Sequence, residues 1–252
     1  MNPFLSKHFY LLRFQFLGFR YHGWQKQPGL KTVQGMIERT TRFVLGEDVK
    51  FKTLGASRTD AMVSARDFPM ELFTYQELST NFLEELNKNL PADIHALSID
   101  QVNSKFNVIK DVSSKEYHYQ FTFNTTKNPF DAHLVTYVHQ TLDIDLMKSA
   151  AELFLGEHNF AGFCYPYEQV DKIRTIHSCK IDFDEERGLY IFKVISKGFM
   201  RYQVRLMIGV LFDIGREKLE TSVLSEALKP GSSIKFDNRA PASGLILHRV
   251  NY

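Results

Sequence analysis

The sequence has few cysteines and no long apolar run. Its two cysteines, Cys164 and Cys179, cannot form a disulfide framework, and neither belongs to a C-x-x-C pair. No stretch approaches the roughly 20 apolar residues of a membrane helix, and the first residues lack the apolar core of a signal peptide. We therefore expect a cytoplasmic protein that is not held in a membrane.

The common cofactor and metal motifs are missing as well. No glycine lies two positions from another, which excludes the G-x-G-x-x-G dinucleotide fingerprint, and there is no G-x-x-x-x-G-K-[ST] phosphate loop. No H-E-x-x-H, no Cys/His group with zinc-site spacing and no G-x-S-x-G nucleophile elbow occurs. We expect neither a cofactor nor a metal, so any chemistry depends on carboxylates, hydroxyls and cations.

The charge balance is nearly neutral, but the charges segregate along the chain. The 252 residues contain 31 Lys and Arg against 29 Asp and Glu, with 44% hydrophobic residues, which is typical of a globular protein. Residues 1–37 contain five basic residues and no acidic one, and residues 187–212 again contain five and none. One basic stretch in each half is what a polyanion groove built from both halves requires. The alternative is chance clustering on solvated faces.

The apolar periodicity predicts an α+β protein with two similar halves. In the first half, strands near 8–16, 51–54, 67–73, 94–102 and 114–123 and helices near 33–44 and 76–89 give an order close to βαββαβ. The second half has helices near 143–154, 200–214 and 222–228 and strands near 174–183, 189–196 and 244–250. We expect two ferredoxin-like (RRM-like) domains, 1–125 and 126–252, with antiparallel sheets around a central cleft and a junction at 124–137.

Three stretches contain candidate functional residues. Small residues at 54–65 surround Asp60 between two strands, where the carboxylate either approaches a ligand or caps a turn. In the strand 115–123, Tyr117 lies at the start of an aromatic face and belongs either to the core or to a cleft edge. In the apolar helix 199–212, Arg205 either extends to solvent or meets a carboxylate or phosphate.

These stretches also carry a family resemblance. Together with Tyr21–Gln25, Thr32–Gly35, Asn89–Ile94 and Gly244–Leu247, they occur in the order and spacing of the TruA-type tRNA pseudouridine synthases. The sequence resembles this family over essentially its whole length. The resemblance implies the pseudouridine synthase fold, a homodimer without metal or cofactor, and isomerisation of uridine in the anticodon stem-loop of tRNA.

The resemblance also implies roles for individual residues. Asp60 matches the catalytic nucleophile, Tyr117 the aromatic residue that stacks on the target base, and Arg205 the cation paired with the aspartate. Arg58 matches the residue that takes the place of the extruded base. Further RNA contacts are expected from the basic and aromatic residues around these motifs: Arg20, His22, Trp24, Gln25, Lys26 and Arg201.

The sequence departs from the family pattern close to these residues. The family motif usually reads G-R-T-D-A-G-V-H-A, and this chain has Ser57, Met62 and Ser64 at the first glycine, the second glycine and the histidine. Asn107 and Leu206 replace a family histidine and asparagine. The alternatives are therefore a retargeted or catalytically weakened paralogue that binds structured RNA, and a structural protein without either activity.

Overall fold

The computed structural model describes residues 7–166 and 172–252, and its chain divides into two compact units. The first unit contains residues 1–113 and 247–252, and the second contains residues 114–246. The division falls earlier than the expected 125/126, because β5 (Ser114–Phe123) pairs with β9 (Leu189–Ser196) of the second unit. The expected junction at 124–137 therefore lies inside the second unit.

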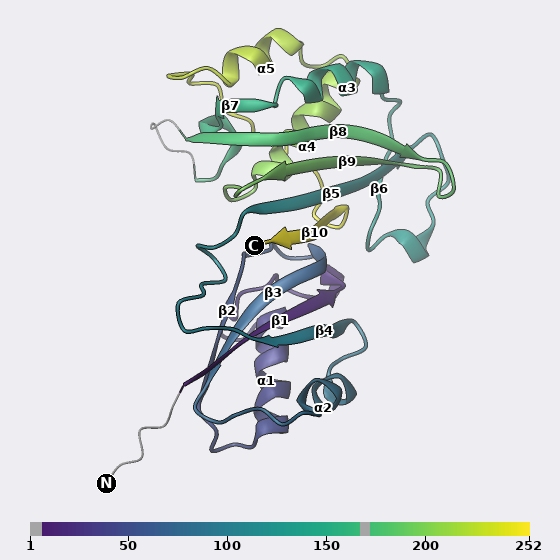
Figure 1. The fold of residues 1–252 in the computed structure, drawn as a ribbon. Helices are drawn as coiled ribbons and strands as arrows, with labels where there is room; N and C mark the ends of the chain where they lie inside the picture. Colours follow the sequence, from purple (N-terminus) through teal and green to yellow (C-terminus); the bar gives the residue numbers. More distant parts are fainter. Residues whose placement is uncertain (1–6, 167–171) are drawn as a thin grey trace. The chain divides into compact units, whose positions relative to one another are not determined.

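The first unit is an antiparallel sheet with two helices (Figure 1). Strand β1 lies between β3 and β4, and β2 pairs with β3 on the side away from β1. The helices α1 and α2 contact each other. The elements are β1 (His8–Phe16), a 3-10 turn η1 (Gly18–Arg20), α1 (Val33–Leu45), β2 (Phe51–Gly55), β3 (Ser64–Thr74), α2 (Phe82–Asn89) and β4 (Ile94–Gln101).

Local sequence signals explain the elements of this unit. The expected strand at 8–16 is confirmed, and Leu12 and Phe14 are almost completely buried. The side chain of Thr32 accepts a hydrogen bond from the N–H of Gly35 and caps α1, which ends at Gly46 in a left-handed conformation. The apolar side of α1 then packs into the core through Val33 and Ile37.

The second unit is also α+β, as expected. Its antiparallel sheet has the order β5-β9-β8-β7, and the short β6 runs parallel to β5. The remaining elements are η2 (Pro129–Asp131), β6 (Thr136–Val138), α3 (Ile144–Glu152), β7 (Gly156–Asn159), η3 (Ala161–Phe163), β8 (Ile173–Asp184), α4 (Gln203–Gly215) and α5 (Thr221–Ala227). The strand β10 (Leu245–Asn251) begins in this unit and ends in the first.

Helix α4 is the central helix of the second unit. Most of its residues are buried, and the ring of Phe212 packs against those of Tyr119 and Phe121 on β5. Helix α3, capped by the side chain of Asp143, contacts both α4 and β8. In the part of the chain that the structure describes, no helix combines the length and apolarity that a membrane crossing requires.

Candidate active site

Asp60 lies in the connection between β2 and β3, at residues 56–63. The connection leaves β2 with a hydrogen bond from the N–H of Ala56 to the carbonyl of Pro69, 2.9 Å long. It ends in a tight turn in which the N–H of Val63 donates to the carbonyl of Asp60 at 3.2 Å. Met62 has a φ of 69° in this turn. The partly exposed Asp60 is therefore fixed at the first position of a sharp chain reversal.

The segment 18–24 supports this loop through its backbone. The N–H of Trp24 donates to the carbonyl of Thr59, and the N–H of Met62 donates to the carbonyl of Tyr21, both at 3.1 Å. The loop is thus bonded to one segment on both sides of the aspartate. Gly23 has a φ of 89°, and a Cβ there would lie 2.6 Å from the carbonyl oxygen of Thr59. Only glycine allows this close approach.

Ser64 adds a side-chain contact between the same two segments. Its Oγ accepts a hydrogen bond from the N–H of Gly18 at 2.9 Å, and the side chain is buried. A Cβ at Gly18 would overlap the carbonyl of Val63. The hydroxyl therefore satisfies a buried N–H where the two backbones touch, a constraint that alternation along the strand could not reveal.

Trp24 supports the loop from inside the core. Its side chain is 2% exposed, its ring is stacked on that of Phe68 with 3.8 Å between centroids, and the ring of Phe16 lies 6.1 Å away. Gly55 makes room for it, because a Cβ there would lie 2.5 Å from the indole nitrogen. The expected contact between the Trp24 ring and RNA is therefore corrected, since this ring lies inside the core with the ring of Phe68 stacked on it.

Asp93 ties down the other end of the supporting segment. Its carboxylate accepts a 2.7 Å hydrogen bond from the hydroxyl of Tyr21 and forms a 2.6 Å ion pair with Arg20. Burial disfavours the charged form of Asp93, but the hydrogen bonds from Tyr21 and Arg20 outweigh it and lower its pKa. Apart from its place in the Asn89–Ile94 motif, no sequence pattern pointed to Asp93.

The other expected RNA contacts of this unit are on the surface. The side chain of Arg58 is exposed and lies 3.5 Å from the amide oxygen of Gln25. The ammonium of Lys26 forms a 2.8 Å ion pair with Glu38, and this carboxylate partly cancels the positive charge that Lys26 presents to a phosphate. Arg20, His22 and Gln25 are also exposed.

In the second unit, Tyr117 lies on the face of β5 that Tyr119 and Phe121 bury. It pairs with Val194 of β9, and its ring meets the ring of Phe199 edge to face at 5.3 Å. Its side chain is 7% exposed, against 0% for the two rings further along the strand. Tyr117 therefore lies at the end of the aromatic row, where the buried face begins.

Arg205 projects from the first turn of α4 and is partly buried. Its Nε donates to the carbonyl of Ala240 at 2.8 Å, and the N–H of Ala240 donates back to the carbonyl of Arg205 at 3.0 Å. Its guanidinium carbon lies 5.7 Å from the ring centroid of Tyr202. The exposed Arg201 also contacts this residue, with a 2.9 Å hydrogen bond to the Tyr202 hydroxyl. The structure therefore brings Arg201 and Arg205 to the same ring.

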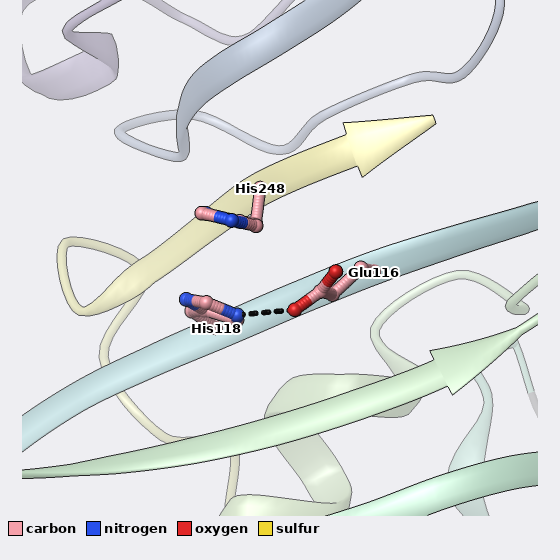
Figure 2. A group of neighbouring side chains, drawn as sticks. All are labelled: Glu116, His118 and His248. Carbon is pink, nitrogen blue, oxygen red and sulfur yellow. Dashed lines mark hydrogen bonds and ion pairs between the residues drawn. The ribbon is translucent and has the colours of Figure 1, made fainter. Parts of the chain in front are cut away.

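Neighbouring residues of β5 point to the opposite face of the sheet. Figure 2 shows the imidazole of His118 bonded to the carboxylate of Glu116, with 2.6 Å between Nε2 and Oε1. Because strand residues alternate between faces, this pair lies on the face away from Tyr117. The Glu116–His118 pair is therefore a polar contact on the opposite face of β5 and not part of the aromatic row. No sequence pattern pointed to it.

Comparisons with known proteins show the family of this chain. A family model described as tRNA pseudouridine synthase matches residues 150–252. The tRNA pseudouridine synthase A of Thermodesulfovibrio yellowstonii is 31% identical over 94% of this chain and 97% of its own. The chain belongs to the tRNA pseudouridine synthase family. The corresponding protein of Dictyoglomus thermophilum is 34% identical over 94% of this chain and 96% of its own, and tRNA pseudouridine synthase A 2 of Clostridium perfringens is 32% identical over 96% and 98%.

The structure shows the conformation or contacts of two residues that depart from the family pattern. Met62 replaces a glycine at a position whose φ of 69° favours glycine, so this chain retains strain of about 1–2 kcal/mol there. Ser64 replaces a histidine, and its hydroxyl bonds the N–H of Gly18 instead. Both substitutions leave the backbone contacts beside Asp60 in place. The loop geometry is therefore compatible with the residues this member has.

We expect Met62→Gly to raise the free energy of unfolding by up to about 1 kcal/mol. Relief of the left-handed strain, about 1–2 kcal/mol, outweighs the roughly 0.5–1 kcal/mol of backbone entropy that glycine adds to the unfolded state. Urea denaturation measures the change. The control is Met36→Gly inside α1, which should lower stability by at least about 1 kcal/mol. A similar loss for both variants would show that residue 62 carries no strain.

We expect Asp93→Asn to lower the free energy of unfolding at pH 7 by about 1.5–3 kcal/mol, because the charged acceptor of Tyr21 and Arg20 is lost. The folded pKa of Asp93 lies below its unfolded value of about 3.9, so its contribution is present above that pH and disappears as the pH falls through the folded pKa.

The difference between wild type and Asp93→Asn should therefore shrink in denaturation curves recorded at progressively more acid pH. Asp100→Asn, at an exposed position of β4, is the matched control and should change stability little at any pH. A stability difference that stays constant from neutral to strongly acid pH would contradict the role of the Asp93 charge.

Proposed function

We propose that this protein isomerises uridine to pseudouridine in the anticodon stem-loop of tRNA. Its relatives over nearly the full length are named tRNA pseudouridine synthase A, and the resemblance of its motifs to the TruA type gives the stem-loop as target. The observation that carries the proposal is the loop of Asp60. An aspartate whose backbone is hydrogen-bonded in place on both sides, within Arg58-Thr59-Asp60-Ala61, is suited to act as a positioned nucleophile.

The reaction needs a carboxylate and a proton acceptor. The bond between N1 of uracil and C1′ of ribose breaks, a bond between C5 and C1′ forms, the C5 proton leaves to solvent, and N1 gains a proton. Asp60 either attacks the sugar or the base, or stabilises the separated intermediate. The reaction is an isomerisation and needs no oxidant or reductant. The uracil ring itself supplies the remaining chemistry.

We assign the partners of Asp60 by the family resemblance. Arg205 acts as the cation that keeps the carboxylate ionised, and Tyr117 stacks on the target base and takes part in proton transfer. Within the second unit, the Nε of Arg205 is anchored to a backbone carbonyl, and the ring of Tyr117 is more exposed than those of Tyr119 and Phe121.

Arg58 is the residue proposed to replace the extruded base in the RNA stack. Its exposed side chain is attached to the same fixed loop as the nucleophile. Flipping a base out of its stack costs a few kcal/mol, and an inserted guanidinium together with a stacking tyrosine offsets part of that cost. Binding would depend on phosphate contacts and folded shape rather than on base reading.

We expect Asp60→Asn to abolish tritium release from tRNA labelled at uracil C5, with a loss of at least about 1,000-fold in single-turnover rate. The amide has nearly the same shape, so folding and tRNA affinity should be retained. Asp100→Asn is the control for removal of one negative charge and should keep the wild-type rate.

The outcomes separate three cases. Release that survives Asp60→Asn would exclude Asp60 as the nucleophile. Binding of tRNA by the wild type without release from any tRNA would make the protein an RNA-binding paralogue without turnover. Release of tritium by the wild type from a stem-loop lacking uridines at the family's target positions would contradict the proposed target.

We also propose a cytoplasmic homodimer, as the family resemblance implies. Both cysteines are buried and neither is in a disulfide bond, which fits a reducing compartment. Sedimentation equilibrium should give a mass twice that of one chain, independent of salt. A monomer mass at micromolar concentration would contradict the dimer.

A further inference from the structure

Three guanidinium groups surround one aromatic ring in the second unit. The guanidinium carbons of Arg239 and Arg201 lie 4.5 Å and 4.7 Å from the ring centroid of Tyr202, and that of Arg205 lies 5.7 Å away. Each arrangement is a cation–π contact. We call Arg201, Tyr202 and Arg239 the arginine cluster. It lies beside Arg205, one of the proposed catalytic residues.

The backbone holds Tyr202 in place. Tyr202 precedes α4 with φ 66° and ψ 0°, a left-handed conformation that a tyrosine adopts only when its surroundings impose it. The completely buried Gln203 contributes, because its side-chain oxygen accepts a 2.9 Å hydrogen bond from the N–H of Met200. The ring at the centre of the cluster is therefore a fixed platform rather than a mobile surface group.

Arg239 is placed by the docking of its own segment on α4. The next residue, Ala240, exchanges two hydrogen bonds with Arg205, and the carbonyl of Pro241 accepts one from the hydroxyl of Tyr119 at 2.9 Å. The preceding residue touches α4 where Gly209 has no side chain, since a Cβ there would overlap the carbonyl of Asn238. Contacts on both sides therefore direct Arg239 to the ring.

The cluster is a concentrated positive charge. Arg201 and Arg239 are exposed, and among residues 7–166 and 172–252 neither forms an ion pair with a carboxylate. The carboxylate of Asp213, on the same helix, is already bonded to Arg216 and to the side chain of Asn238. Like charges at such spacing repel one another, and a bound anion removes that repulsion.

An exposed aromatic ring adjoins the cluster. The ring of Tyr165 is 51% exposed, with 6.3 Å between its centroid and that of Tyr202 and 5.9 Å to the guanidinium of Arg239. Guanidinium groups beside an exposed aromatic ring suit a nucleic-acid strand, because phosphates pair with the cations and a base stacks on the ring.

We propose that the arginine cluster is a phosphate-binding site for the RNA backbone at nucleotides next to the modified uridine. This inference rests on the proposed function, and it adds Arg239 and Tyr202 to the residues that the family resemblance assigns. The site positions the strand and does not take part in bond breaking. It binds ground state and transition state alike, so its loss should raise KM and leave kcat unchanged.

The test measures the affinity of the complete protein for a tRNA transcript over a series of KCl concentrations. Arg239→Gln should reduce the magnitude of the negative slope of log K against log salt by roughly 0.7–1, because one phosphate contact is lost. Arg239→Lys should keep most of the slope because it keeps the charge. The matched control is Arg174→Gln, an exposed arginine of β8 whose guanidinium bonds the carbonyl of Ile173, and its slope should equal that of the wild type.

Binding and turnover give separate answers. An unchanged slope in Arg239→Gln, or an equal reduction in Arg174→Gln, overturns the phosphate site whether or not the protein is an enzyme. A reduced slope in Arg239→Gln alone, with a raised KM and an unchanged kcat, supports it. If the wild type binds tRNA but releases no tritium, the proposed function fails and the slope still decides the site. A wild type without measurable tRNA affinity overturns both.

Discussion

The two backbone hydrogen bonds beside Asp60 are the constraint on which the candidate active site depends. They join Thr59 to Trp24 and Met62 to Tyr21. The backbone position of Asp60 is therefore set by a segment that α1 and β2 separate from it in the sequence. The buried Trp24 ring and the Asp93 carboxylate hold that segment in turn. An aspartate whose backbone is fixed in this way loses less conformational freedom when a ligand binds, and such a loss is a large part of many reaction barriers.

The second unit uses a similar arrangement around a helix. Helix α4 is buried on most sides, and it also presents Arg205 at its first turn. Residues 238–241 pack against α4, and the carbonyl of Ala240 accepts a hydrogen bond from the Nε of Arg205. This bond sets the direction of the guanidinium. The core of this unit and the placement of its cations are therefore coupled, because the same helix supplies both.

Much of the fold could be predicted from the sequence, since periodicity and caps act locally. The strand at 8–16 and the helices near 33–44 and 143–154 are all confirmed. The structure divides the chain at 113/114 rather than at 125/126, because strand pairing between β5 and β9 joins residues far apart in the sequence. Short strands such as β6 and β7 lacked a pattern long enough to detect. Trp24 was misplaced because an aromatic residue in a basic stretch suits a core and a surface equally well.

The way the Asp60 loop is held also bears on how its sequence can drift. Every residue except proline has the same main-chain N–H and C=O groups, so a loop held mainly through them accepts different side chains without moving its backbone. Met62 and Ser64 are two such exchanges. Gly18 and Gly23 have no such freedom, since any side chain there would collide with the loop itself. The residues near Asp60 that tolerate the least change therefore lie outside the Arg58–Ala61 motif.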